Sequence, residues 1–178
     1  MGADKAEMNI GGMPQVVRIA DGLAGDGWEV TVLGGSPIRG HAHRADDERL
    51  AGPLAALRGF VLQPWPVFVC SCDLPLFRPL VASALLGRLG AVPVVPVVGG
   101  RPQPLCALYP ASAFATLRAN PGWVRVTDWL QATGSDLVDE EGLQGLGLDP
   151  VWVANANTPA EFAALVGRLE TPVQPATN

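Results

Sequence analysis

The stretch from Val67 to Phe77 constrains the fold of this chain more than any other. It reads Val-Phe-Val-Cys-Ser-Cys-Asp-Leu-Pro-Leu-Phe, so a short apolar run ends abruptly at Asp73. An unbroken apolar run of this length is typical of a strand buried on both faces, as in a parallel sheet. Pro75 cannot continue the pairing, because proline has no backbone N–H. The sequence therefore predicts a buried strand with an acidic residue at its carboxyl end.

Asp73 has two interpretations. In open α/β sheets, ligands bind beyond the carboxyl ends of the strands, and a carboxylate there suits a divalent cation beside the phosphates of a nucleotide. Alternatively, Asp73 opens a turn, because an Asp before Leu-Pro is a common way to leave a strand. The residues of this stretch are compatible with both.

The composition narrows the class of protein. The chain has 178 residues, of which 48% are hydrophobic and 16% charged, which predicts a packed globular fold. A net charge of −5 without a cluster of Lys or Arg argues against nucleic-acid binding. No apolar run approaches the roughly 18 residues of a membrane span, and the N-terminus is not built like a signal peptide. We therefore expect a cytoplasmic protein with no membrane partner.

Cysteine and histidine give no strong metal signal. Cys70 and Cys72 alternate along the predicted strand, and with Cys106 they do not form a disulfide framework. We expect small buried hydrophobic residues in a reducing compartment; the alternative, a thiolate metal site, would need a second cysteine pair. His41 and His43 lie in a polar loop without a partner ligand, so they are interpreted as surface residues rather than metal ligands.

Apolar spacing predicts alternating helices and strands. Helices are expected over 14–25, 53–61, 78–89, 111–119, 124–131 and 158–169, the last with Thr158 as N-cap and Glu161 in a capping box. Strands are expected over 28–33, 67–72, 92–98, 105–109, 136–139 and 151–154, with loops over 38–51 and 142–149. Pro93 and Pro96 favour an edge strand or an extended segment for 92–98. The alternation predicts one α/β domain over residues 1–170 with a mostly parallel sheet, followed by a polar tail over 171–178.

Five short motifs follow one another in a fixed order. They are Met1-Gly2-Ala3-Asp4-Lys5 with Gly12-Met13-Pro14, Asp46 with Gly52-Pro53-Leu54-Ala55, Cys72-Asp73-Leu74-Pro75, the segment 101–109 from Arg101 to Tyr109, and the segment 155–162 from Asn155 to Phe162. In this order and spacing the chain resembles the molybdenum cofactor guanylyltransferases, nearly from end to end. The resemblance implies a Rossmann-like three-layer nucleotidyltransferase fold. Asp4 and the Asn-x-Asn-Thr-Pro ending are similar to the guanylyl rather than the cytidylyl branch.

The resemblance also implies a reaction. The terminal phosphate of molybdopterin would attack the α-phosphorus of GTP and release pyrophosphate. Because two polyanions must approach each other, neutralisation by cations matters more than acid–base catalysis. Lys5 and Asp73 are the implied catalytic residues, with Lys5 against the GTP phosphates and Asp73 holding Mg²⁺ between them. Asp46 and Gly52 are implied on the nucleotide, where a carboxylate can accept from the guanine N1–H and amino group.

The acceptor side is implied by residues later in the chain. Arg101, Asn155 and Asn157 would face molybdopterin, and molybdoenzymes or their chaperones are the implied partner proteins. Each assignment has a plainer alternative. Lys5 and Asp46 could be solvated surface charges, and Asn157 could be a turn residue ahead of the Thr158 cap.

The chain departs from the family pattern at its start. The family has a strand and a Gly-rich phosphate loop before the Met-Gly-x-Asp-Lys segment, whereas this sequence starts at Met1. The missing strand would be central, so we expect its loss to expose apolar edges. A misassigned start or fragmentary gene, a non-catalytic relative that binds molybdopterin or a partner protein, and an enzyme for a cytidylyl or sugar-phosphate substrate are the three explanations.

Overall fold

The computed structural model of the protein describes residues 9–45, 52–60 and 64–170. Lys5 and Asp46, which the resemblance places on the nucleotide, lie outside these ranges, so their roles stay predictions. Within the described ranges, no helix is long and apolar enough to cross a membrane.

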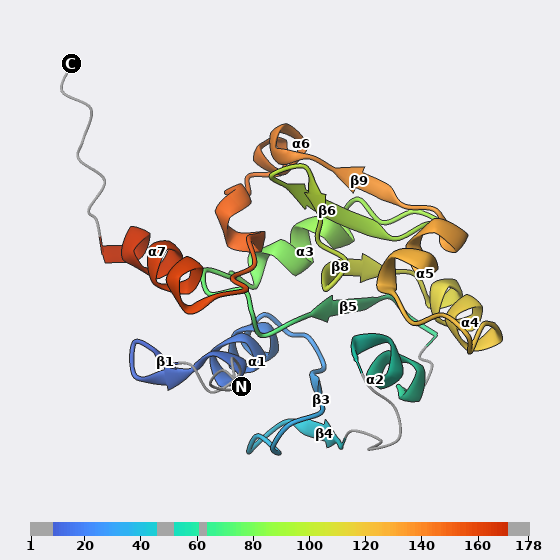
Figure 1. Ribbon diagram of the computed structural model, residues 1–178, viewed down its shortest axis with the longest axis horizontal. Coiled ribbons are helices and arrows are strands. Elements are labelled where there is room, and N and C mark those ends of the chain that lie inside the picture. Colours follow the sequence, from blue (N-terminus) through green and yellow to red (C-terminus); the bar gives the residue numbers. More distant parts are fainter. Residues whose placement is uncertain (1–8, 46–51, 61–63, 171–178) are drawn as a thin grey trace.

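The main sheet is built on β5 (Val67–Cys70), which lies in the middle of the molecule (Figure 1). β5 pairs antiparallel with β8 (Cys106–Tyr109), and β8 pairs antiparallel with β6 (Val94–Val98). β6 also pairs antiparallel with β7 (Arg101–Pro102) and parallel with β9 (Asp136–Val138). The predicted strands over 67–72, 105–109 and 136–139 are thus present, in shorter form.

Two small sheets lie apart from the main one. β3 (Thr31–Leu33) pairs parallel with β4 (Ala42–Arg44), and β1 (Asn9–Ile10) pairs antiparallel with β2 (Met13–Pro14). β4 falls inside the predicted 38–51 loop. A strand of three residues with exposed ends has no apolar pattern that could have revealed it.

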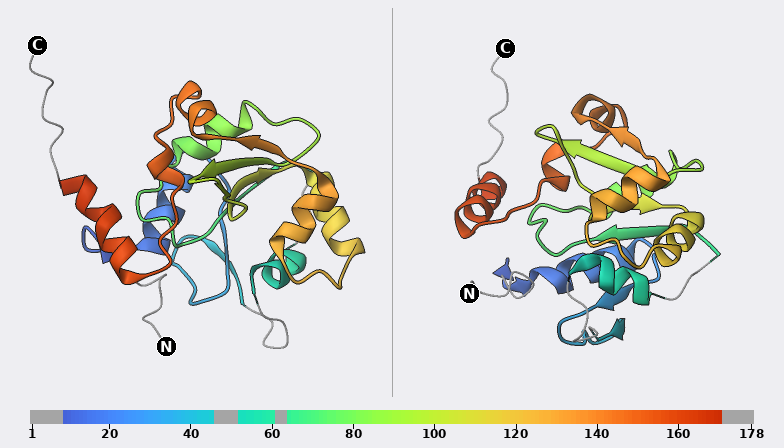
Figure 2. Two further views of the ribbon diagram at one scale, coloured as in Figure 1. Left: turned by 45° about the horizontal axis from the view of Figure 1, so that its top comes forward. Right: turned by 45° about the vertical axis from the view of Figure 1, so that its right-hand side comes forward.

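Helices cover both sides of the main sheet (Figures 1 and 2). The described helices are α1 (Gln15–Gly25), α2 (Pro53–Gly59), α3 (Leu80–Leu86), α4 (Ala111–Ala119), α5 (Val126–Thr133), α6 (Glu140–Gly145), the short 3₁₀-helix η2 (Pro150–Val153) and α7 (Pro159–Glu170). All six predicted helices begin within two residues of the expected position. The helix predicted over 78–89 is shorter, over Leu80–Leu86.

The core consists of two hydrophobic clusters, one on each face of β5. Phe68 and Cys70 pack against a cluster that includes Ile19 and Leu23 of α1, together with residues of α3. Val67 and Val69 pack against the other, which is formed by α2, α4, α5 and β8. Because alternate side chains of a strand point to opposite faces, β5 contributes to both clusters. The prediction that both faces of this strand are covered is therefore confirmed. The cover is incomplete, since all four residues are half-buried.

The expectation of a mostly parallel sheet is not confirmed. Of the described pairings, only β3 with β4 and β6 with β9 are parallel, and β5 itself pairs antiparallel. An apolar run shows that both faces of a strand are covered, and helices on both sides provide that cover here. It does not determine the direction of the neighbouring strand.

The segment 92–98 was expected to be an edge strand or an extended segment rather than a central strand, and this is wrong. Its strand β6 has three partners among the described strands. The prolines are accommodated because their carbonyl groups still accept: the Asp136 N–H donates to the Pro93 oxygen at 2.8 Å, and the Gln103 N–H donates to the Pro96 oxygen at 2.8 Å.

Two further expectations near the C-terminus are wrong. The predicted 142–149 loop contains the end of α6, which starts because the Asp139 carboxylate accepts from the Gly142 N–H at 2.8 Å. The predicted strand over 151–154 is the 3₁₀-helix η2 instead. There the Asp149 carboxylate accepts from the Val151 N–H at 3.0 Å, and Pro150 suits the first turn of a helix. In both cases a capping Asp decides the local structure.

The last helix has the predicted capping box. The Glu161 N–H donates to the Thr158 hydroxyl at 3.1 Å, and the Glu161 carboxylate accepts from the Thr158 N–H at 3.0 Å. Phe162, Leu165 and Val166 of this helix are half-buried.

The cluster around α4 and α5 supplies a test of the core. Leu117 of α4 is fully buried, whereas Leu80 of α3 is 52% exposed. Leu117→Ala should therefore lower the free energy of unfolding by about 2–5 kcal/mol, because it removes buried methyl groups and leaves a cavity. Leu80→Ala is the matched control and should change it by about 0.5 kcal/mol or less. Urea unfolding of both variants measures the difference, and equal losses would contradict the core described here.

Candidate functional site

Asp73 lies in the turn that follows β5. The Ser71 hydroxyl donates to one oxygen of its carboxylate, and the Phe77 N–H donates to the Leu74 oxygen at 3.1 Å, which closes the turn. Leu74, like Phe77, is buried, whereas Asp73 is half-buried. The carboxylate is thus held by a fixed turn and remains open to a ligand.

Two side chains of α1 hold this turn in place. The Gln15 amide donates to the Leu74 oxygen, and Gln15 itself is fully buried. The Arg18 guanidinium donates to the Phe77 oxygen at 2.9 Å and to the Pro75 oxygen at 2.9 Å. Arg18 also donates to the Gln15 side-chain oxygen at 3.2 Å, so the pair acts as one unit. Partial burial lowers the pKa of Arg18, with the charge of Arg78 as a smaller cause.

The loop ahead of α7 is tied to the same turn. The Ala156 N–H donates to the Asp73 backbone oxygen at 2.8 Å, and Ala156 is buried. Asn155 and Asn157, on either side of it, therefore lie next to the Asp73 turn although they are more than 80 positions away in the sequence. Figures 1 and 2 show this loop beside the start of α1 and the carboxyl end of β5.

The two asparagines differ in their surroundings. Asn155 is half-buried, and Asn157 is exposed. The backbone N–H of Asn157 donates to the Glu161 carboxylate at 2.7 Å. Asn157 thus helps to start α7 through its backbone N–H, and its side chain takes no part in this hydrogen bond.

Arg101 and Gly52 belong to other elements, β7 and the start of α2. Arg101 is exposed and lies on β7, within the β6–β7 hairpin. The chain that follows returns to β5, where the Ser71 N–H donates to the Leu105 oxygen at 2.7 Å. Gly52 precedes α2 with a φ of 88°, a conformation that favours glycine. Among the described residues, no hydrogen bond or ion pair joins Arg101 or Gly52 to Asp73.

The other candidate ligands are engaged elsewhere. The His41 ring lies 2.7 Å from the Asp21 carboxylate, and the His43 ring contacts the backbone oxygens of Gly34 and Gly35. Cys70 lies opposite Cys106 in the β5–β8 ladder, and burial raises the pKa of its thiol well above the usual value. Within the described ranges, no three His, Cys, Asp or Glu side chains gather as a metal site.

Sequence reasoning missed Gln15 and Arg18. Both lie on the helix that was predicted, at positions separated by one turn, but nothing in a single sequence shows that they reach residues 74–77. The one available signal was Gln15 itself, a polar residue directly after Pro14 in a stretch of apolar spacing.

Comparisons with known proteins agree with this geometry. A family model described as the MobA-like NTP transferase domain matches residues 1–137. This chain belongs to that family. The match confirms the resemblance inferred from the motifs and supports a nucleotidyltransferase.

The fold is similar to that of solved structures. Molybdopterin-guanine dinucleotide biosynthesis protein A from Archaeoglobus fulgidus matches with a TM-score of 0.70 and 17% identity, over 95% of this chain and 92% of that chain. A protein from Aquifex aeolicus VF5 matches with a TM-score of 0.52 and 19% identity, over 66% of this chain and 63% of that chain. Among the curated proteins, no match was found. At these identities the likeness shows the fold.

The contacts of Arg18 lead to a prediction. Arg18→Met should lower the free energy of unfolding by about 1–3 kcal/mol, because the buried oxygens of residues 75 and 77 would lose their donor. Arg18→Lys should recover only part of this loss, since one ammonium cannot reproduce the guanidinium fork. Arg39→Met, at an exposed loop position, is the control and should change little. Chemical denaturation measures all three, and a wild-type value for Arg18→Met would contradict the role of this side chain.

Proposed function

We propose that this protein transfers GMP from GTP to the terminal phosphate of molybdopterin, with release of pyrophosphate. Membership of the MobA-like NTP transferase family supports nucleotidyl transfer. The guanine nucleotide and the molybdopterin acceptor rest on the motif resemblance and on the similarity to the Archaeoglobus fulgidus protein.

One observation carries the proposal: the hydrogen bond from the Ala156 N–H to the Asp73 oxygen. This bond joins two of the sequence motifs. The resemblance places the Asp73 motif on the metal and the nucleotide, and it places the motif around Ala156 on the acceptor. A phosphoryl-type transfer needs its two substrates in line and close together. The two substrates could meet where the Asp73 turn lies next to Asn155 and Asn157.

The residues present fit a magnesium ion. Mg²⁺ is usually held by one or two carboxylates together with substrate phosphates, rather than by a full set of protein ligands. Asp73 offers a half-buried carboxylate with no cationic side chain paired to it among the described residues. Asp73 would hold the ion, which when bound neutralises phosphate charge.

The remaining residues would bind and orient the substrates. Lys5 would contact the GTP phosphates as a point charge, and Asp46 with Gly52 would contact the nucleoside. Arg101, Asn155 and Asn157 would face the acceptor. Gln15 and Arg18 are positioning residues in this scheme, because they hold the turn that carries Asp73 and touch no substrate themselves.

The role of Asp73 is tested by Asp73→Asn. This variant should lower kcat/KM for magnesium-dependent pyrophosphate release by about 100-fold or more, because the charge that binds the ion is lost while the shape is kept. Asp26→Asn, at an exposed acid beyond the end of α1, should leave the rate unchanged. The assay contains GTP, Mg²⁺ and molybdopterin. Full activity of Asp73→Asn would remove Asp73 from the site, and ligand binding without any turnover by the wild-type protein would favour a non-catalytic relative.

The acceptor side is tested separately. Asn155→Ala should raise the KM for molybdopterin several-fold and leave the KM for GTP unchanged, because only the acceptor would lose a hydrogen-bond partner. Asn120→Ala, at the far end of α4, is the control. A change in the KM for GTP alone would place Asn155 on the nucleotide instead.

A further inference from the structure

Two cysteines of the main sheet face each other across neighbouring strands. Cys70 of β5 lies directly opposite Cys106 of β8 in the antiparallel ladder, so both side chains lie on the same face of the sheet. Cys106 is buried in the hydrophobic cluster that includes Leu23, and Cys70 packs against this cluster. Both residues are free thiols. The ladder therefore holds two reduced thiols side by side at the edge of the core.

The hydrogen bonds of the ladder show which type of pair the two cysteines form. The Ser71 N–H donates to the oxygen of Leu105, its opposite residue, at 2.7 Å. The Cys106 N–H donates to the Gln103 oxygen at 2.9 Å and not to β5. Because hydrogen-bonded and non-hydrogen-bonded pairs alternate, Cys70 and Cys106 form the closer, non-hydrogen-bonded type, in which the Cα atoms are about 4.5 Å apart. A disulfide spans Cα separations of about 4.4–6.8 Å, so the backbone already permits a bond between them.

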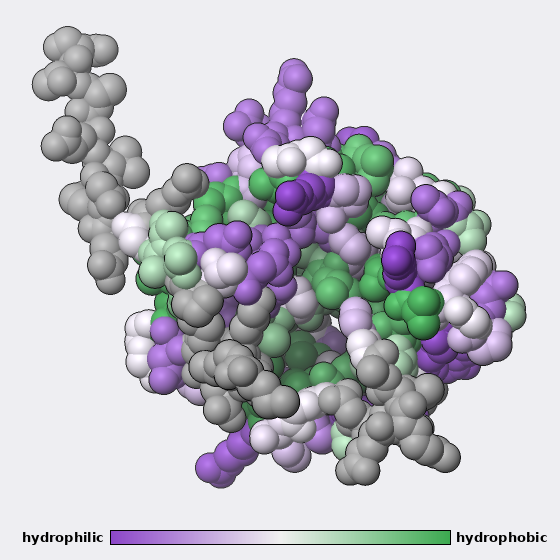
Figure 3. Space-filling model, in the orientation of Figure 1, coloured by the Kyte–Doolittle hydropathy of each residue, from purple (hydrophilic) through white to green (hydrophobic). Residues whose placement is uncertain are grey.

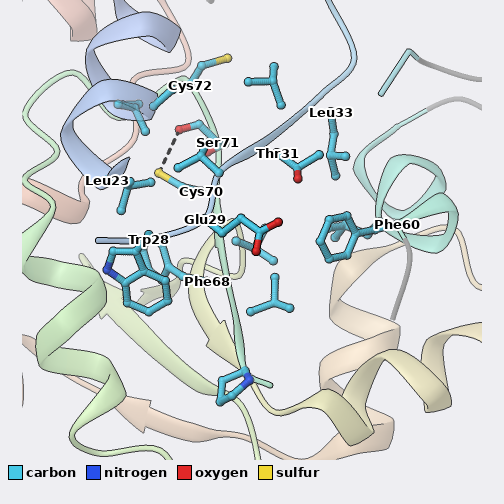
Figure 4. A pocket seen from close by; sticks show the side chains of 18 of the residues that line it. Leu23, Trp28, Glu29, Thr31, Leu33, Phe60, Phe68, Cys70, Ser71 and Cys72 are labelled. Atoms are coloured by element: carbon cyan, nitrogen blue, oxygen red, sulfur yellow. Dashed lines mark hydrogen bonds between the residues drawn. The ribbon is translucent and has the colours of Figure 1, made fainter. Parts of the chain in front are cut away.

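The two thiols interact in the reduced protein. Burial raises the pKa of Cys70 well above its usual value, and a hydrogen bond with the Cys106 thiol is the next cause. The Cys70 thiol also contacts the Ser71 oxygen at 3.6 Å, as the dashed line in Figure 4 shows. In that view the Cys70 sulfur lies toward Leu23, and the Cys72 sulfur lies well away from it. The geometry therefore favours Cys106 over Cys72 as the partner of Cys70.

The two thiols differ in their access to solvent. Cys106 is 1% exposed, whereas Cys70 is half-buried and lines a cleft of about 540 Å³. Figure 3 shows the surface hollowed at this place, with hydrophobic side chains inside. A small uncharged oxidant can enter such a cleft without losing a charged hydration shell. Cys70 is therefore the thiol that meets the oxidant first, and Cys106 is the thiol that waits behind it.

We propose that Cys70 and Cys106 are a peroxide-sensitive thiol pair, in which a reversible disulfide protects Cys70 from irreversible oxidation. First, the Cys70 thiolate attacks one oxygen of hydrogen peroxide. The O–O bond breaks, a sulfenic acid forms on Cys70, and the released hydroxide takes up the thiol proton as water. Next, the Cys106 sulfur attacks the Cys70 sulfur. The S–O bond breaks as the S–S bond forms, and the hydroxyl group leaves as water with the Cys106 proton. In sum, the two thiols lose two electrons and two protons, and the peroxide is reduced to two waters.

The position of Cys70 explains what the disulfide prevents. A sulfenic acid without a partner thiol is oxidised further to a sulfinic acid, which thiols do not reduce. That charged group would lie against the apolar residues of α1 and α3, where an unpaired charge is costly, and three residues from Asp73. The first step is slow, because the thiolate is the reacting form and Cys70 is mostly protonated. The second step is intramolecular and has its partner in place, so the sulfenic acid does not accumulate.

The experiment treats the folded protein with hydrogen peroxide and follows its intact mass. The wild-type protein should lose the mass of two hydrogen atoms, and dithiothreitol should restore the original mass. Peptide mapping without reductant should show the peptide of Cys70 joined to the peptide of Cys106. Cys72→Ser should form the same cross-link at about the wild-type rate, because Cys72 takes no part in the bond. A cross-link through Cys72, or no cross-link at all, would overturn the proposal.

Two variants of Cys106 test the protective role. In Cys106→Ala and Cys106→Ser, Cys70 loses the thiol that would trap its sulfenic acid. Peroxide should therefore add the mass of two oxygen atoms to Cys70, which dithiothreitol does not remove, and should lower the urea midpoint of unfolding. The wild-type midpoint should not fall. Circular dichroism before treatment shows which variants fold, and the wild-type mapping decides the cross-link without either of them. Oxidation of Cys70 that dithiothreitol fully reverses in a folded Cys106 variant would overturn the protective role.

Discussion

The structure depends on the way β5 divides its side chains between two cores. Phe68 and Cys70 enter one hydrophobic cluster, and Val67 and Val69 enter the other. A four-residue strand thus determines where the helices on both sides lie. Its carboxyl end is held in the same position by both cores, so Asp73, three residues beyond it, has a fixed place relative to α1 and to the loop before α7.

The turn at Asp73 is held mainly by backbone oxygens that accept from distant segments. Gln15 and Arg18 donate to residues 74, 75 and 77 from one side, and Ala156 donates to residue 73 from the other. Buried carbonyl groups must find donors when they leave a ladder. Because these donors come from two distant parts of the chain, α1 and the loop before α7, the turn can form only when the fold is complete. This fixes the position of Asp73, whose carboxylate accepts a hydrogen bond from the Ser71 hydroxyl.

Local patterns in the sequence predicted the elements better than their pairing. The apolar spacing of α1 and the capping box of α7 are read within one or two turns, and both are present in the structure. The acidic turn after β5 was found for the same reason. The direction of β8, the central place of β6 and the contacts of Gln15 and Arg18 depend on residues far apart in the chain, and no local pattern encodes them. The 3₁₀-helix η2 shows a further limit, because Val-Trp-Val-Ala has a strand composition that the Asp149 cap overrides.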